Sequence, residues 1–259
     1  MLLVISSSNL IKPIDSVAAL DEKSSAAAQQ LASELALPLS AAASASNQLW
    51  LSEQGLSLNM PALGKPFCID FNSGKYDHRR KFGGGRGQPL AKAIGLKQGQ
   101  NPSVIDATAG FARDAFVIAS LGCQVTMLEQ NAIMAALLAD ALSRADQESD
   151  IAVITARMQI HHSNAIEFLT ETNVTADVIY LDPMYPAREK SALVKKDMQL
   201  LHQLAGADTD SAELLAVARQ KAVKRVVVKR PKGAEFVGEQ KPAASIHSKN
   251  TRFDIYPTR

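Results

Sequence analysis

The chain has 259 residues, 46% of them hydrophobic and 21% charged, which is enough apolar material for a packed core. Its 28 basic and 26 acidic residues leave a net charge of only +2, so any nucleic-acid contact must come from local clusters. No apolar run approaches the roughly 20 residues of a membrane helix, and the start MLLVISSS lacks the basic flank of a signal peptide. We therefore expect a cytoplasmic protein without a membrane partner.

Residues 1–75 predict a small N-terminal α+β module, and its position before the rest of the chain suggests contact with RNA. We expect a strand over residues 2–6, an alanine-rich helix over 17–37, a hairpin over 48–59 and a strand over 67–71. The two cysteines, Cys68 and Cys123, lie in apolar, strand-like settings without metal-ligand spacing. Both thiols are therefore expected to be buried.

A basic, glycine-rich connector spans residues 76–99. Its glycines would let a phosphodiester approach the backbone closely, and its cations could contact that phosphate: Arg79, Arg80, Lys81 and Arg86. A solvated linker between two modules is an equally good interpretation. The GK[ST] ending of a nucleotide-binding P-loop is missing from this segment.

Residues 103–131 predict a βαβ unit. A buried strand ends at Asp106, a small-residue turn runs to Gly110, a helix covers 111–121, and a second strand precedes Glu129. In an open parallel sheet, ligands bind outside the carboxyl ends of the strands. We therefore expect Asp106 to face a ligand ammonium and Glu129 to take a ribose diol.

A third strand is predicted over 158–162, followed by Ser163 and Asn164. These two residues could bond an adenine edge, cap the helix expected over 165–169, or do both. Elsewhere we expect helices over 131–145, 190–205 and 210–222, a strand over 225–228 and an antiparallel terminal pair over 244–248 and 253–256. Residues 148–157 are ambiguous between helix and strand.

The fourth strand, over 176–183, ends in Asp182-Pro183-Met184-Tyr185-Pro186. The prolines restrict the backbone around Asp182, so its carboxylate and the neighbouring carbonyls would be held rigidly. A planar amine could donate its hydrogens to that carboxylate while Tyr185 stacks on the ring. An Asx-type turn with a packing tyrosine is the alternative.

Two further basic clusters follow in the chain. One lies at the start of the helix expected over 190–205 and one follows a strand, and each could contact an RNA phosphate or be solvated: Arg188, Lys190, Lys195, Lys229 and Arg230.

The segments DATAGFARD, LEQN, YLDPMYP, KSALVKK, KRVVVKRP and RFDIYP together resemble the bacterial ribosomal small subunit methyltransferase J family, over about residues 100–259. The resemblance implies an α/β, Rossmann-like class I methyltransferase domain with a seven-stranded, mostly parallel sheet containing one antiparallel strand. It also implies methyl transfer from S-adenosylmethionine to the exocyclic N2 of a guanine in 16S rRNA, giving S-adenosylhomocysteine. No metal is implied, and 16S rRNA or the small subunit is the expected partner, with no obligate protein partner.

The resemblance also assigns roles to matching residues. The methionine end of the cofactor would meet Arg113 and Asp114, the ribose Glu129, and the adenine region Gln130, Ser163 and Asn164, with Asp106 and Gly110 beside them. Asp182 would lie next to the transferred methyl, in a motif resembling [DN]PP[YF] in which Pro183 and Tyr185 match and Met184 does not. The single glycine, Gly110, argues against a dinucleotide, whose pyrophosphate needs close backbone approach.

Three alternatives stay open. A DNA amino-methyltransferase acting on adenine N6 or cytosine N4 shares the DPPY-like motif. A nicotinamide dehydrogenase would also suit the βαβ unit, although GxGxxG is missing. A non-catalytic rRNA-binding assembly factor would keep the fold without binding the cofactor.

Overall fold

A computed structural model describes residues 14–74, 76, 85–146, 149–184, 196–205 and 210–258. The chain divides into two compact units: Met1–Cys68 with Lys190–Gly206, and Ile69–Glu189 with Ala207–Arg259. The domain boundaries expected at residues 75 and 99 stay predictions. The strand expected over 2–6 lies outside the described residues, as does the first part of the helix expected over 190–205.

The first unit contains a four-stranded sheet in the order β2-β1-β3-β4. Its described elements are β1 (Ser16–Ala19), α1 (Ser25–Glu34), β2 (Leu39–Ser40), β3 (Gln48–Ser52), β4 (Gly55–Asn59), the 3-10 turn η1 (Pro61–Leu63) and α8 (Lys196–Ala205). The expected hairpin is confirmed, because β3 and β4 pair antiparallel from Gln48↔Asn59 to Ser52↔Gly55.

The helix expected over 17–37 is wrong at its start. Val17 and Ala18 are fully buried in β1, which pairs in parallel with both β2 and β3, and α1 begins only at Ser25. An alanine-rich sequence favours a helix locally, but burial between two neighbouring strands overrides that preference here.

The strand expected over 67–71 is also wrong. Phe67 forms one isolated bridge with Leu58, and the chain then turns instead of extending the pairing. Ile69 and Phe71 are buried while Cys68 is exposed, so the buried thiol expected at Cys68 is wrong and the one at Cys123 is confirmed. Cys68 follows the partly buried Phe67 and precedes the buried Ile69, and its own side chain faces solvent.

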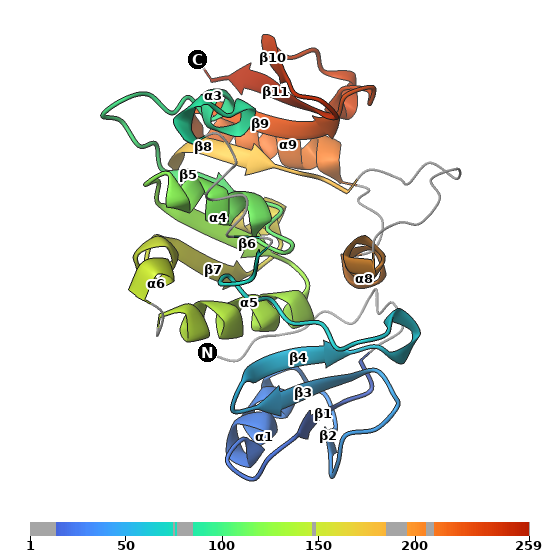
Figure 1. Cartoon of the computed structure of the whole chain (residues 1–259). Coiled ribbons are helices and arrows are strands. Elements are labelled where there is room, and N and C mark those ends of the chain that lie inside the picture. The colour runs from blue at the N-terminus through green and yellow to red at the C-terminus, as the bar shows by residue number, and fades with distance from the viewer. Residues whose placement is uncertain are drawn as a thin grey trace. The chain divides into compact units, whose positions relative to one another are not determined.

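The second unit is built on a seven-stranded sheet in the order β10-β11-β9-β8-β5-β6-β7, which Figure 1 shows stacked from top to bottom. Its strands are β5 (Val104–Asp106), β6 (Val125–Glu129), β7 (Met158–His162), β8 (Ala176–Leu181), β9 (Ala222–Pro231), β10 (Ala244–His247) and β11 (Thr251–Pro257). β11 runs antiparallel to both of its neighbours, β9 and β10, and the remaining pairings are parallel. The expected mixed sheet with one antiparallel strand is confirmed.

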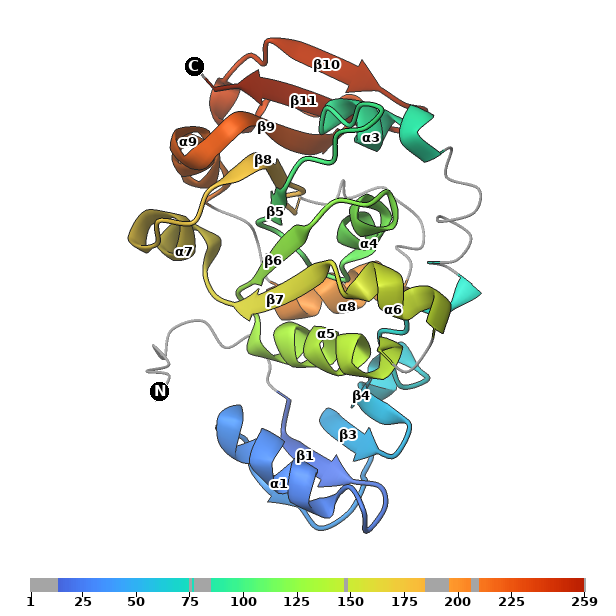
Figure 2. The ribbon, with the colours of Figure 1, turned by 90° about the vertical axis from the view of Figure 1, so that its left-hand side faces the viewer.

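Helices cover both faces of this sheet. They are α3 (Pro89–Ala93), α4 (Arg113–Ser120), α5 (Ala132–Ala145), α6 (Ser149–Thr155), α7 (Ala165–Glu171) and α9 (Ser211–Lys221), with 3-10 turns η2 (Gly85–Gly87) and η3 (Val237–Glu239). Figure 2 shows α7 and α9 on one side of the sheet and α3, α4 and α6 on the other. Of the ambiguous segment 148–157, Ser149–Thr155 is helical and residues 156–157 form a turn. Within the described residues, no helix is long and apolar enough to cross a membrane.

Burial on both faces explains why the inner strands read as continuous apolar runs. Ile179 and Leu181 of β8 join Val226 and Val228 of β9 in the core under α7 and α9. Alternate residues face the other way, so Tyr180 lies on the α4 side. This alternation decides which polar side chains meet at the end of the strands.

Candidate functional site

The loop between β5 and α4 is tied to the strands on both sides of β5. The backbone N–H of Ala107 donates to the carbonyl of Tyr180 at 3.0 Å, and that of Ala109 donates to the carbonyl of Leu128 at 3.1 Å. Gly110 (φ 51°) and Ala112 (φ 54°) adopt the left-handed region. Glycine does so without a Cβ penalty, whereas Ala112 accepts about 1–2 kcal/mol of strain. The loop is therefore a tight turn fixed at the carboxyl edge of the sheet.

Glu129 ends β6 with both carboxylate oxygens bonded to backbone. Oε2 accepts the N–H of Gly110 at 3.0 Å and Oε1 accepts that of Asn131 at 2.8 Å. Burial raises the pKa of Glu129 to about 7, although these backbone donors pull in the opposite direction. The carboxylate is thus aimed by the loop, and its remaining lone pairs suit a pair of hydroxyl donors.

Three polar residues lie beside Glu129 at the ends of β6 and β7. The backbone N–H of Ser163 donates to the carbonyl of Glu129 at 3.0 Å, and Asn164 Nδ2 donates to Gln130 Oε1 at 3.4 Å. Asn164 Oδ1 also caps α7 by accepting the N–H groups of Ile166 and Glu167, so the capping interpretation is confirmed. Contact of these residues with an adenine stays a prediction.

A second cluster lies at the ends of β8 and β9, where one ammonium bridges two carboxylates. Lys229 Nζ donates to Asp114 Oδ2 and to Asp182 Oδ2, each at 2.7 Å. The Tyr180 hydroxyl donates to the same Asp114 oxygen at 2.7 Å. The backbone N–H of Asp182 donates to Thr108 Oγ1 at 2.6 Å, which ties this turn to the loop after β5.

Charges in this cluster are strongly coupled. Burial alone would lower the pKa of Lys229, but the carboxylates of Asp182 and Asp114 outweigh it and hold that pKa above its usual value. Burial first, and then Asp114, raises the pKa of the Tyr180 hydroxyl. Lys229 and Tyr180 therefore keep their protons, and both act as hydrogen-bond donors to Asp114.

Asp106, the last residue of β5, interacts with the charged groups of this cluster and is only 2% exposed. Burial, with smaller contributions from Asp114 and Asp182, raises the pKa of Asp106 to about 8, while Lys229 and the N–H of Thr108 act in the opposite direction. Its carboxyl group is thus largely protonated at neutral pH. The expected contact between Asp106 and a ligand ammonium stays a prediction.

The other predicted site residues fall into two groups. Arg113 is the first residue of α4, with its guanidinium carbon 4.9 Å from the Phe111 ring centroid, and Pro183 is buried beyond β8. Tyr185 lies outside the described residues, as do six of the predicted RNA-binding cations: Arg79, Arg80, Lys81, Arg188, Lys190 and Lys195.

The described cations of that set have partners within the protein. Arg86 donates to the carbonyl of Lys97 at 2.7 Å and to Asn101 Oδ1 at 2.6 Å, and Arg230 Nε donates to the carbonyl of Glu235 at 3.3 Å. RNA contact by Arg86, Lys229 and Arg230 stays a prediction.

Sequence reasoning did not place Thr108, Tyr180 or Lys229 in this cluster. A signal existed for Lys229, because Leu181 is in register with Val228, so the residues that follow them are neighbours at the same strand ends. For Thr108 and Tyr180, side-chain direction decides, and one sequence does not fix which hydroxyl meets which carboxylate.

Comparison with known proteins agrees with this geometry. A family model described as "Putative SAM-dependent methyltransferase" matches residues 30–258. The ribosomal RNA small subunit methyltransferase J of Tolumonas auensis is 56% identical over 200 residues, covering 77% of this chain and 80% of the relative. The chain belongs to the ribosomal RNA small subunit methyltransferase J family.

Further similarities support membership in the methyltransferase J family. The protein of that name from Hydrogenovibrio crunogenus is 55% identical over 204 residues, or 78% of this chain and 73% of the relative. The crystal structure of a SAM-dependent methyltransferase from Neisseria gonorrhoeae superposes with a TM-score of 0.74 at 36% identity, covering 93% of this chain and 96% of that one. The expected family and its class I fold are therefore confirmed.

The residues present fit S-adenosylmethionine, the methyl donor that gives this methyltransferase family its description. The donor carries a sulfonium cation and a ribose diol but no phosphate. The sheet edge offers carboxylates at Asp114, Glu129 and Asp182, and a turn with two left-handed residues instead of a glycine-rich phosphate cradle. The charge and the donor set of the edge both complement such a cation.

Proposed function

We propose that this methyltransferase modifies the exocyclic N2 amine of a guanine in 16S rRNA of the small ribosomal subunit. Family membership supports the class of reaction, and the printed names of the relatives support ribosomal RNA of the small subunit as the substrate. The choice of N2 rests on the family resemblance and on the chemistry of the turn after β8.

One observation carries the proposal: Asp182 is an anchored carboxylate at the carboxyl edge of the sheet. Its backbone N–H is bound by Thr108 and one carboxylate oxygen by Lys229, while its side chain is 39% exposed. An exocyclic amine is a poor nucleophile because its lone pair is delocalised into the ring. A carboxylate that accepts an amine hydrogen directs the lone pair away from the ring and orients the nitrogen.

The roles of the chain's own residues follow from this arrangement. When bound, S-adenosylmethionine supplies a methyl group on a positively charged sulfur. Glu129 holds the ribose hydroxyls, and Asp114 faces the methionine end. Asp182 accepts an N–H of the amine and takes the proton that the nitrogen gives up when it gains its carbon.

Access to the amine requires the guanine to leave its stack, at a cost of a few kcal/mol. Stacking on an aromatic side chain, for which Tyr185 is the candidate, returns about 1–3 kcal/mol. Phosphate contacts from the basic clusters supply the remainder, so binding should weaken as salt concentration rises.

The test is transfer of a labelled methyl group from S-adenosylmethionine to small subunits, and separately to naked 16S rRNA, both isolated without this modification. Digestion to nucleosides should release label as N2-methylguanosine. Label in N6-methyladenosine or N4-methylcytidine from bare duplex DNA, with none in rRNA, would overturn the proposal in favour of a DNA amino-methyltransferase. Salt-dependent rRNA binding without calorimetric binding of S-adenosylmethionine would instead indicate a non-catalytic assembly factor.

A further inference from the structure

Lys229 reaches the candidate site from the strand next to the one that delivers Asp182. β9 pairs in parallel with β8 through Leu181↔Val228, and pairs antiparallel with β11 through Phe253↔Lys229. The three residues before Lys229, Val226 to Val228, are fully buried. The lysine backbone is therefore fixed on both sides, and its side chain emerges from a packed core.

The side chains of Asp114, Lys229 and Asp182 differ in their exposure to solvent, and this difference indicates a different role for each one. The Asp114 side chain is 8% exposed, that of Lys229 is 26% exposed and that of Asp182 is 39% exposed. Asp114 is also bound by the buried Tyr180 hydroxyl, so its position does not depend on Lys229 alone. Lys229 thus links an anchored, buried carboxylate to a more exposed one.

We propose that Lys229 is a positioning residue for methyl transfer: braced against Asp114, its ammonium fixes the Asp182 carboxylate in the direction that meets the amine. This inference rests on the proposed function. It also gives Lys229 a role inside the site, in addition to the RNA contact that its place in a basic cluster predicts.

Charge balance at the edge supports this role. The groups that face one another are Asp106 on β5, Asp114 on α4, Tyr180 on β8, Asp182 after β8 and Lys229 on β9. Among these groups Lys229 is the cation, and it lies 2.7 Å from two carboxylates. Without it, Asp114 and Asp182 would repel each other, and Asp182 would turn away or take up a proton. A protonated carboxyl group donates a hydrogen bond where the amine needs an acceptor.

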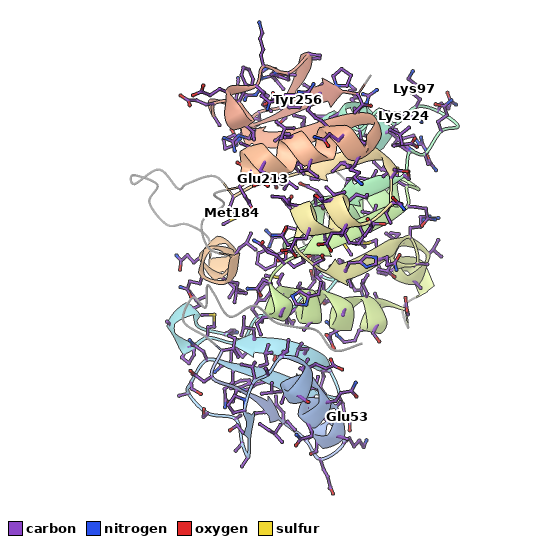
Figure 3. The ribbon with its side chains drawn as sticks, turned by 180° about the vertical axis from the view of Figure 1, so that it is seen from behind. Glu53, Lys97, Met184, Glu213, Lys224 and Tyr256 are labelled. Atoms are coloured by element: carbon purple, nitrogen blue, oxygen red, sulfur yellow. The ribbon has the colours of Figure 1, made fainter. Side chains whose placement is uncertain are left out.

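The same pair of strands provides a matched control. Lys224 of β9 forms an ion pair with Asp177 of β8 at 3.0 Å, with side chains 58% and 26% exposed. Figure 3 shows Lys224 at the end of the strands opposite Met184, which lies two residues after Asp182. Lys224→Met removes the same kind of cation from the same two strands without touching the candidate site.

The experiment compares wild type, Lys229→Met, Lys229→Arg and Lys224→Met in methyl transfer to unmodified small subunits. We expect Lys229→Met to lower kcat by about 100-fold, as misplaced reacting groups do, with a smaller change in KM. Because the ammonium favours charged carboxylates, the variant should also need a higher pH to reach its full rate. Lys229→Arg should recover part of the rate, and Lys224→Met should match wild type in rate and pH profile.

Circular dichroism and calorimetric titration with S-adenosylmethionine establish that each variant is folded and binds the donor. A wild-type kcat and pH profile for Lys229→Met would overturn the proposal. A raised KM for the subunit with an unchanged kcat would also overturn it, because Lys229 would then be an RNA contact only. If Lys229→Met does not fold, Lys229→Arg decides, because the larger guanidinium displaces Asp182 and a wild-type kcat would contradict the positioning role. A wild-type protein that methylates no RNA overturns both this inference and the proposed function, whereas an active wild type with an unaffected Lys229→Met overturns this inference alone.

Discussion

The two ends of the β8–β9 strand pair carry the same residue types in different surroundings. At one end, Lys224 meets Asp177 at 3.0 Å across a largely exposed surface. At the other end, Lys229 meets Asp182 at 2.7 Å and shares its ammonium with the buried Asp114. Exposed pairs of the first kind contribute roughly 0–1 kcal/mol to stability. The surroundings of an ion pair, more than its residue types, therefore indicate whether it belongs to a functional site.

Asp182→Ala should have the largest effect on the rate of methyl transfer. Removing the acceptor for the amine should lower methyl transfer by at least about 100-fold, which is the lower range for a group that handles a proton. The matched variant Asp177→Ala should keep nearly full activity. Transfer of labelled methyl to small subunits measures both, and similar activities for the two variants would contradict the role of Asp182.

A second variant, Glu129→Gln, tests whether Glu129 binds S-adenosylmethionine. The amide nitrogen of glutamine cannot accept a hydrogen bond, so either the Gly110 or the Asn131 N–H loses its partner, at about 1–3 kcal/mol. We expect the affinity for S-adenosylmethionine to fall by about tenfold or more in calorimetry. An unchanged affinity would remove Glu129 from the cofactor site.

A smaller effect is expected from Thr108→Val, which keeps the shape of the side chain but removes the acceptor of the Asp182 N–H. The turn after β8 would lose its tie to the loop after β5, at about 1 kcal/mol. We expect kcat to fall several-fold with donor affinity unchanged. A fall in donor affinity without a change in kcat would show that Thr108 supports the cofactor loop and not Asp182.

Asp106→Asn should change stability more than rate, and only at high pH. The folded protein holds the Asp106 proton more tightly than the unfolded chain, because burial raises the pKa of Asp106 from 3.8 to about 8. Stability from this group is therefore present below pH 4 and is lost as pH rises towards 8. Urea unfolding should show the variant more stable than wild type at pH 8, by several kcal/mol, and nearly equal at pH 4. A pH-independent difference would argue against a buried, proton-holding carboxyl group.

Periodicity and strand-end motifs predicted most of the second unit from sequence. Asp106, Glu129 and Asp182 each follow an apolar run, and because parallel strands share an edge, the shared location of these acids followed from the pattern. The first unit is harder to predict, because its alanine-rich start carries no clear period and favours a helix at Val17. Only its pairing with β2 and β3 decides that it is a strand.

The role of Lys229 was hidden by its neighbours in the sequence. In KRPKG it reads as one cation among several, and RNA contact is the natural interpretation of such a run. Its partner Asp114 is 115 positions away, in α4, the helix of the βαβ unit. Strand alternation separates Lys229 from Arg230, which bonds a backbone carbonyl instead. Contacts over such separations depend on strand order, which a single sequence does not specify.

The pairing of β11 along β9 has a consequence for synthesis of the protein. β9 is an inner strand because residues 251–257 lie beside it, from Thr251↔Pro231 to Pro257↔Arg225. A nascent chain that has not yet released these residues from the ribosomal exit tunnel leaves β9 as an open edge. Lys229 then lies on a strand paired on one side only, so β9 gains its second neighbour only after residues 251–257 have left the tunnel, later than every residue of the candidate site.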